Sequence, residues 1–274
     1  MYLILKPEYK IIIDENRTYF FNVFIKNSFH ADNTKTINWI LLKDLCYRGI
    51  TVEFLKDNRN NTLDFLKYLL KTKRESFILA ESIVDIKRTI NCRSIISLGL
   101  DIGSSEKILK KYIQAYEETT ITVLGDLNGT LQEFLSQNGL NCTSKLNQCE
   151  DESQIVIINK DYQAINNFER DENIVVIPYS IAHMTMGPCD FDLSRQNVKL
   201  QQEITESSES EVNIASFANI TSLYSVMLNC LLYLIGNIHE ILYTDAGLPL
   251  QREFKFHLPS LKLTATPVYK EGNN

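Results

Sequence analysis

The N-terminal part of the chain alternates hydrophobic and polar positions in short runs that are typical of strands. These runs are Tyr2–Lys6, Lys10–Asp14 and Thr18–Lys26. Apolar residues then recur at helical spacing over Thr36–Leu45 and over Thr62–Thr72, and Phe77–Leu79 is again strand-like. This order of strands, two helices and a closing strand predicts a small winged-helix-like domain over residues 1–82.

The remainder of the chain, residues 83–274, has the pattern of an α/β domain. Two continuous apolar runs, Gln154–Asn159 and Asn173–Pro178, are typical of parallel strands that are covered on both faces. A further strand, Thr120–Leu124, is followed by a helix over Thr130–Asn138, which is the order of a βαβ unit. We therefore expect an α/β chain in which a Rossmann-type domain follows the winged-helix-like domain.

The C-terminal third adds a long helix and a hairpin to this domain. A polar, acidic segment over Gln201–Glu211 is predicted to be a solvated loop, and an apolar helix follows over Ala215–Gly236. Two strands, Glu253–Leu258 and Leu261–Thr266, then form a hairpin. The longest apolar run, Leu223–Ile235, predicts a segment too short to span a bilayer, so we expect no membrane association.

Composition narrows the class of protein. The 274 residues are 44% hydrophobic and 23% charged, which excludes a disordered or fibrous chain. The net charge of −6 argues against a nucleic-acid binder. The six cysteines contain no C-x-x-C pair, and no signal peptide is seen, so a cytoplasmic protein with reduced thiols is expected.

Two glycines follow the strand Thr120–Leu124 at the position of a phosphate-binding loop. Gly125, Asp126 and Gly129 lie where small residues would let backbone N–H groups approach a phosphate at a helix N-terminus. Leu127 stands in place of a middle glycine, and its side chain would crowd a pyrophosphate. The loop is therefore either a degenerate nucleotide site or a tight strand–helix turn without a ligand.

Other candidate residues lack the partners that a metal site or a catalytic site needs. Cys189 after Gly187-Pro188 resembles half of a zinc knuckle, but Asp192 occupies the position of the second cysteine, so no metal site is predicted. His183 lies in a loop after a strand without a serine or cysteine nucleophile to pair with it. We assign no catalytic residue.

Positive charge gathers on and after the second predicted helix. The residues are Lys67, Lys71, Lys73 and Arg74. They form either a solvated face with favourable charges at a helix C-terminus or one side of a groove for an acidic or amphipathic peptide. In the second case Thr18–Lys26 would be an edge strand open to strand addition.

The order and spacing of these segments resemble a known family. Residues 1–80 resemble the recognition element that binds precursor leader peptides in the maturation of ribosomally made peptides. The segments Ile121–Leu140 and Ile177–Cys189 resemble the glycine loop and the "GP…C" turn of E1/ThiF-like proteins, and the long helix with the two final strands resembles the C-terminal end of that family. Together they resemble the E1-like (McbB or Ocin-ThiF-like) partners of YcaO cyclodehydratases, which occur in thiazole/oxazole clusters, including those for thiopeptides.

The resemblance implies a non-catalytic scaffold that binds a leader peptide and presents the core peptide to a YcaO enzyme for azoline formation. The expected peptide-binding residues are Tyr19, Phe20, Phe21, Asn22, Val23, Phe24, Ile25, Lys67, Leu70, Lys71 and Arg74. It implies no cofactor on this chain, with ATP and Mg²⁺ on the YcaO partner and FMN on a flavin-dependent azoline dehydrogenase. It also implies a homodimer through the α/β domain.

Two other functions stay open at this point. One is an active E1-like adenylating enzyme that uses Gly125–Thr130. The other is a transcription regulator with a winged helix and an effector domain, against which the acidic charge and the lack of a further basic helix both argue.

Overall fold

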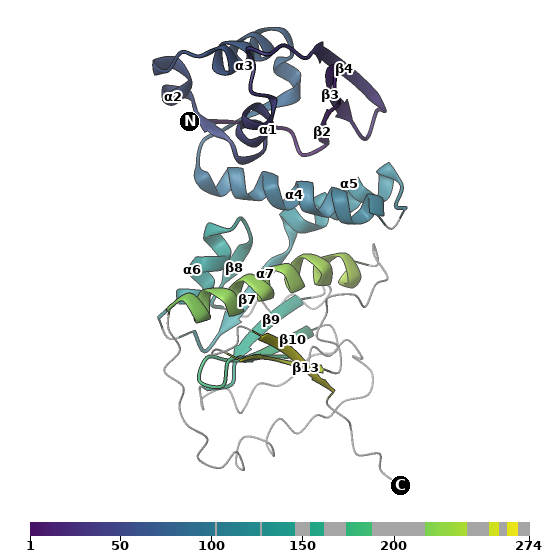
Figure 1. Ribbon diagram of the computed structural model, residues 1–274. Helices are drawn as coiled ribbons and strands as arrows, with labels where there is room; N and C mark the ends of the chain where they lie inside the picture. The colour runs from purple at the N-terminus through teal and green to yellow at the C-terminus, as the bar shows by residue number, and fades with distance from the viewer. Residues whose placement is uncertain are drawn as a thin grey trace. The chain divides into compact units, whose positions relative to one another are not determined.

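A computed structural model describes residues 1–101, 103–126, 128–145, 154–161, 174–187, 217–239, 252–257 and 262–267 (Figure 1). The chain divides into two compact units. The first holds Met1–Ile113 with Gln137–Gly139, and the second holds Gln114–Ser136 with Leu140–Asn274. The residues 1–82 predicted as a winged-helix-like domain lie wholly in the first unit.

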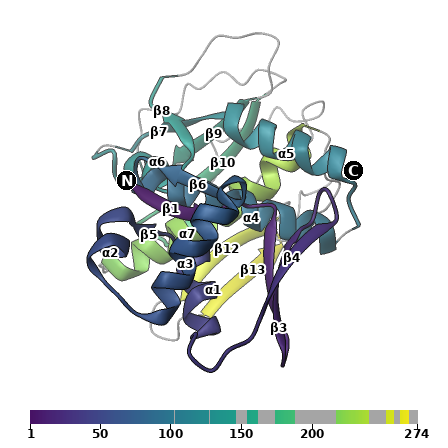
Figure 2. The same ribbon diagram turned by 90° about the horizontal axis from the view of Figure 1, so that it is seen from above.

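The first unit contains two small antiparallel sheets. One has the order β5-β1-β6, with β1 (Tyr2–Leu5), β5 (Ile50–Thr51) and β6 (Phe77–Ala80). The other has the order β2-β3-β4, with β2 (Tyr9–Ile13), β3 (Arg17–Asn22) and β4 (Asn27–Asp32). The hairpin of β3 and β4 can be followed in Figure 2.

Helices α1 (Trp39–Arg48), α2 (Val52–Asp57) and α3 (Asn61–Thr72) cover the core of this unit. Each begins where a polar side chain caps it: Asn38 accepts the N–H of Leu41, and Asn60 accepts the N–H of Leu63. The apolar faces of the helices pack with the strands into one cluster that includes Leu5, Phe20, Leu42, Leu63 and Leu66. The two helices predicted in this region are therefore confirmed.

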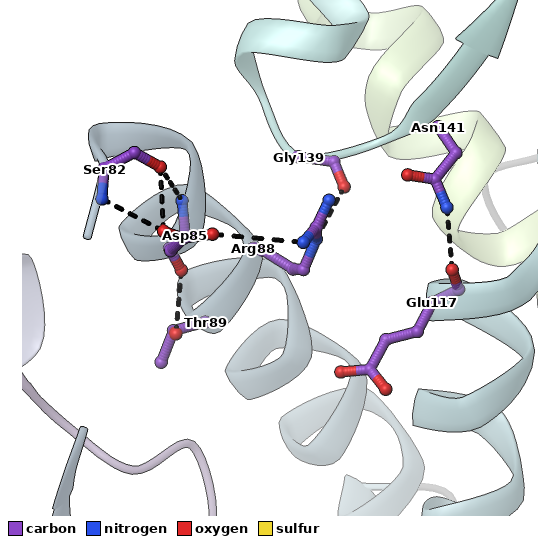
Figure 3. Close-up of polar contacts among 7 residues, drawn as sticks. All are labelled: Ser82, Asp85, Arg88, Thr89, Glu117, Gly139 and Asn141. Atoms are coloured by element: carbon purple, nitrogen blue, oxygen red, sulfur yellow. Dashed lines mark hydrogen bonds and ion pairs between the residues drawn. The ribbon is translucent and has the colours of Figure 1, made fainter. Parts of the chain in front are cut away.

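Helix α4 (Ile83–Asp101) follows β6, and after it comes α5 (Glu106–Glu118). The start of α4 is a capping box: the Ser82 N–H and hydroxyl donate to Asp85 over 3.0 and 2.8 Å, and the Asp85 N–H donates to the Ser82 hydroxyl over 3.2 Å (Figure 3). One turn later the Arg88 Nε donates to the carbonyl oxygen of Gly139 over 3.3 Å. Gly139 has φ +90°, and a Cβ there would lie 3.0 Å from the Arg88 backbone, so this position requires glycine.

The strand predicted over Thr18–Lys26 is too long. It ends at Asn22, whose side-chain oxygen accepts the N–H groups of Phe24 and Ile25 and so forms a turn. Lys26 completes the reversal with φ +51°, and β4 begins directly after it. The prediction was wrong because the apolar residues of the turn continue the strand pattern without a glycine or proline.

The second unit contains a seven-stranded mixed sheet with the order β13-β12-β11-β10-β9-β7-β8. Strands β8 (Asn141–Thr143), β7 (Thr120–Leu124), β9 (Gln154–Asn159) and β10 (Ile174–Ser180) are parallel. Strands β11 (Thr185–Met186), β12 (Arg252–His257) and β13 (Lys262–Pro267) continue the sheet in antiparallel pairing. Residues 155–158 and 174–180 are all buried, which confirms the parallel strands expected from their apolar runs. The chain is therefore an α/β protein with a Rossmann-like sheet.

Helix α6 (Thr130–Gln137) follows β7, and α7 (Phe217–Ile238) lies across the sheet (Figure 1). Within α7 the 19-residue stretch Ile220–Ile238 is long and apolar enough to cross a membrane by length and composition, so the expectation of a segment too short to do so was wrong. Half of this stretch is buried inside the protein. The fully buried residues Leu223, Met227, Leu231 and Leu234 recur at helical spacing, which is the pattern of a core helix on a sheet.

Candidate functional site

The outer edge of β4 presents unpaired backbone groups. In an antiparallel ladder alternate residues bond to the neighbouring strand, and the N–H of Asn33 donates to the Asn16 oxygen over 2.8 Å. The odd residues Phe29 and Ala31 therefore bond to β3, and Ser28, His30 and Asp32 direct their N–H and C=O groups away from it. Within the described part of the chain no hydrogen bond is made by these outward backbone groups. This edge can accept another strand.

The opposite edge of the same sheet is partly covered. The outward N–H of Ile11 in β2 donates to the hydroxyl of Tyr47 over 2.7 Å. Arg93 of α4 stacks on the Tyr47 ring at 4.4 Å and donates to the backbone oxygens of Tyr47 and Leu5 over 3.0 and 2.7 Å. Burial raises the pKa of the Tyr47 phenol, so its hydroxyl stays neutral and keeps this bond to the strand. The middle of the β2 edge is therefore blocked, whereas no such cover lies on the β4 edge among the described residues.

The inner side of β4 is apolar and lies beside the end of α3. Phe29 stacks on Phe20 with ring centroids 4.6 Å apart, and Lys73, the residue after α3, places its ammonium 5.3 Å from the Phe29 ring. On the outer side, the ring of His30 lies 5.7 Å from that of Tyr19. The side chains of a strand added at this edge would therefore point alternately to the apolar side and to the polar side of the sheet.

The structure corrects the predicted edge strand. Thr18–Lys26 was expected to be open to strand addition, but β3 is the central strand, with β2 on one side and β4 on the other. Its Phe20 is fully buried in the core, and Asn22 is buried as the side chain that caps the turn. These two expected contact residues have structural roles instead.

The other residues expected in this segment lie on the same sheet or in the following turn. Tyr19 and Phe21 are half-buried residues of β3. Val23, Phe24 and Ile25 form the turn, where the Lys110 ammonium lies 5.5 Å from the Phe24 ring and the side chain of Ile25 is 65% exposed. Phe21 and the turn residues lie at the end of the sheet where β4 begins, whereas Tyr19 pairs with His30 further along the strand.

The expected residues of α3 divide by role. The Lys67 ammonium donates to the Asn58 oxygen and pairs with Asp64 at 3.3 Å. Leu70 packs against the core of the first unit. Lys71 and Arg74 are exposed, and no ion pair among the described residues involves them.

The glycine loop of the second unit is closed by its own carboxylate. Gly125 and Gly129 have φ +73° and +65°, and α6 begins at Thr130. The two carboxylate oxygens of Asp126 accept the N–H groups of Thr130 over 3.1 Å and of Gln132 over 2.9 Å. These two N–H groups at the start of the helix are therefore already bonded to a carboxylate of the chain itself. Leu127 lies outside the described residues.

Two buried tyrosines lie near this loop. The Tyr224 hydroxyl is 3.0 Å from that of Thr130, and the Tyr179 hydroxyl is buried. Burial, followed by the negative charge of Asp126, raises the pKa of Tyr179. Both phenols are therefore neutral at physiological pH, and neither is an activated base.

The described residues offer neither a metal-binding cluster nor a reactive thiol. They contain no group of three His, Cys, Asp or Glu side chains that could hold a metal ion. Burial raises the pKa of Cys46 and Cys230 to about 12 and that of Cys142 to about 11, so these free thiols stay protonated. Cys189, Asp192 and the acidic segment Gln201–Glu211 lie outside the described residues. The exposed His183 donates its backbone N–H to Ser180.

Sequence reasoning missed three parts of the site: β4, Tyr47 and Arg93. The first had a signal, because Phe29 and Ala31 alternate with polar residues directly after Lys26-Asn27. The contact between Tyr47 and Arg93 had no signal in the sequence, because the two residues are 46 positions apart and belong to different helices.

No protein-family model matches the sequence, and no curated protein does. Among solved structures, a heterocyclase in complex with substrate and cofactor is similar at 11% identity, over 98% of this chain and 38% of that chain, with a TM-score of 0.44. The heterocyclase TruD is similar at 14% identity, over 97% and 41%, with a TM-score of 0.44. MccB of E. coli with MccA is similar at 10% identity, over 100% and 99%, with a TM-score of 0.44.

The chain spans about two fifths of the length of the two heterocyclases. The matches extend over nearly all of this chain.

Proposed function

We propose that the first unit captures an extended peptide as an additional strand along β4, and that the peptide is the leader of a ribosomally made precursor. The observation that carries this proposal is the asymmetry of the β2-β3-β4 sheet. Tyr47 covers the β2 edge, whereas Ser28, His30 and Asp32 leave the β4 edge unpaired. Strand addition gives affinity through backbone hydrogen bonds, and side-chain pockets select the sequence.

The basic residues beside β4 support a leader with acidic side chains. Lys73 lies over Phe29, and Lys71 and Arg74 are exposed near it in sequence. Ion pairs formed there would be screened by salt, so binding should weaken as ionic strength rises. In this proposal the first unit is the winged-helix-like recognition element that the sequence resembles.

The second unit would act as a scaffold and not as an adenylating enzyme. The Asp126 carboxylate occupies the donors at the start of α6, and a nucleotide phosphate would meet its negative charge. We infer that this unit holds a YcaO-type partner, which carries out the ATP-dependent cyclisation that gives an azoline. Holding the leader then raises the effective concentration of the core peptide at that partner.

The test is fluorescence anisotropy with labelled leaders of the precursor peptides encoded by neighbouring genes. The wild-type chain should bind one leader with micromolar or tighter affinity, and His30→Pro, which removes an outward N–H group, should weaken that binding. Absence of binding to every neighbouring leader, with the YcaO partner present, would overturn the proposal. Thermal unfolding with ATP and Mg²⁺ should show no stabilisation, whereas a bound ligand at 100 times its Kd would add about 2.7 kcal/mol.

A further inference from the structure

Charge is divided unevenly between the two units. Residues 1–113 carry 19 Lys and Arg against 13 Asp and Glu, a net charge of +6, whereas residues 114–274 carry 9 against 21, a net charge of −12. Residues 137–139, which belong to the first unit, carry no charge. The overall charge of −6 therefore hides a basic unit, and the open strand edge belongs to that unit.

The beginning of β4 is surrounded by cations. Lys26 is exposed and immediately precedes the strand. The Lys73 ammonium lies 5.3 Å from the Phe29 ring, and the Lys110 ammonium lies 5.5 Å from the Phe24 ring. Lys110 forms an ion pair with Glu106 at 2.6 Å. The three lysines and this glutamate together have a net charge of +2.

The end of β4 has the opposite sign. Asp32 is its last residue, and the side chain of the adjacent Asn33 donates to the backbone oxygens of Asp14 and Glu15, which brings that acidic turn alongside. Arg17 forms an ion pair with Asp32 at 3.2 Å. This end of the sheet therefore has one cation and three carboxylates, a net charge of −2. Six residues of strand span about 17 Å, which exceeds the screening length of about 8 Å at physiological salt. A ligand therefore senses the two ends separately.

We propose that a peptide paired antiparallel to β4 carries its carboxylates at the C-terminal end of the paired segment. An antiparallel strand begins beside Asp32 and finishes beside Ser28, where the cations gather. The surrounding sheet is wholly antiparallel, which favours this direction. This inference rests on the proposed capture at β4 and adds the charge order of the ligand.

The test is selection of a random library of 12-residue displayed peptides on the immobilised full-length chain. Enriched peptides should carry Asp or Glu in their C-terminal third, and His30→Pro should fail to retain them. One enriched peptide is then synthesised with its acidic residues moved to the N-terminal third, which keeps its composition. We expect the rearranged peptide to bind about fivefold more weakly. Lys26→Glu with Lys73→Glu should abolish this difference, and Lys56→Glu, an exposed charge on α2, should leave it unchanged.

The outcomes separate the two proposals. Peptides that His30→Pro loses, but that show no charge order or the reverse order, would overturn the polarity and leave strand capture standing. Failure to enrich any peptide that depends on His30 would overturn both. Binding of duplex DNA that is lost in the double variant, without an enriched peptide, would assign the basic end to nucleic acid and overturn the inference.

Discussion

Substituting His30 by proline tests the open edge of β4 directly. The N–H of His30 faces away from β3, so proline removes no hydrogen bond of the β3–β4 ladder, and proline is tolerated at such edge positions. The change loses only the contact between the His30 and Tyr19 rings. We therefore expect the free energy of unfolding to change by less than about 1 kcal/mol.

The effect on binding should be larger. Ser28, His30 and Asp32 each offer one donor and one acceptor, so an added strand makes about six backbone hydrogen bonds, worth about 0.5–1.5 kcal/mol each. Proline at the central position removes one donor and leaves a carbonyl of the peptide unpaired, at a cost of about 2 kcal/mol. The Kd should rise about thirtyfold.

The assay is anisotropy with a labelled leader, with circular dichroism to verify folding. The matched control is Ile13→Pro, which removes an outward N–H from the end of β2 on the other edge of the sheet and should leave the Kd unchanged. If folded His30→Pro binds the leader as the wild type does, the reasoning that places the peptide on β4 is refuted.

Three further predictions concern stability. Gly139→Ala places a Cβ 3.0 Å from the Arg88 backbone at φ +90° and should cost about 2 kcal/mol, seen as a Tm lower by about 4–8 °C; an unchanged Tm would contradict the close approach. Asp126→Ala removes the three hydrogen bonds that its carboxylate accepts from Thr130 and Gln132 at the start of α6 and should cost about 1 kcal/mol in denaturant unfolding, with no loss of leader binding. The hydrogen bonds from Ser82 lower the pKa of Asp85 in the folded state. The contribution of Asp85 to the free energy of unfolding is therefore present above its unfolded pKa and is lost as the pH falls through its folded pKa. Asp85→Asn should therefore weaken the pH dependence of stability below about pH 4, and an unaltered acid unfolding profile would exclude that role.

The elements that were predictable from the sequence are those encoded by local periodicity. Helix α3 follows from the spacing of its leucines, and β9 and β10 follow from continuous apolar runs. The error lay between Phe20 and Phe29, where aromatic residues occupy a strand, a turn and the next strand in succession. A side-chain hydrogen bond of Asn22 ends β3, and such bonds leave no periodic signal.

The candidate site was less predictable than the fold because it depends on pairing between strands. The sequence indicated an open strand beside α3 but assigned it to β3, since only the sheet order reveals which strand is central. The protected edge depends on Tyr47 and Arg93, which meet only through tertiary packing. The sequence placed Asp126 in a degenerate phosphate loop, and its bonds to the start of α6 were not predicted.

The position of Arg93 has a practical consequence for dissecting the protein. A fragment cut at residue 82, where the sequence pattern of the recognition element ends, would lack this arginine and its support of Tyr47. The Tyr47 hydroxyl would then be held less firmly over the Ile11 N–H, which leaves this part of the β2 edge more exposed. Such an edge pairs indiscriminately with other chains, so the short fragment should aggregate and bind peptides without selectivity. A fragment that ends after α4, at Asp101, would retain a single, specific edge.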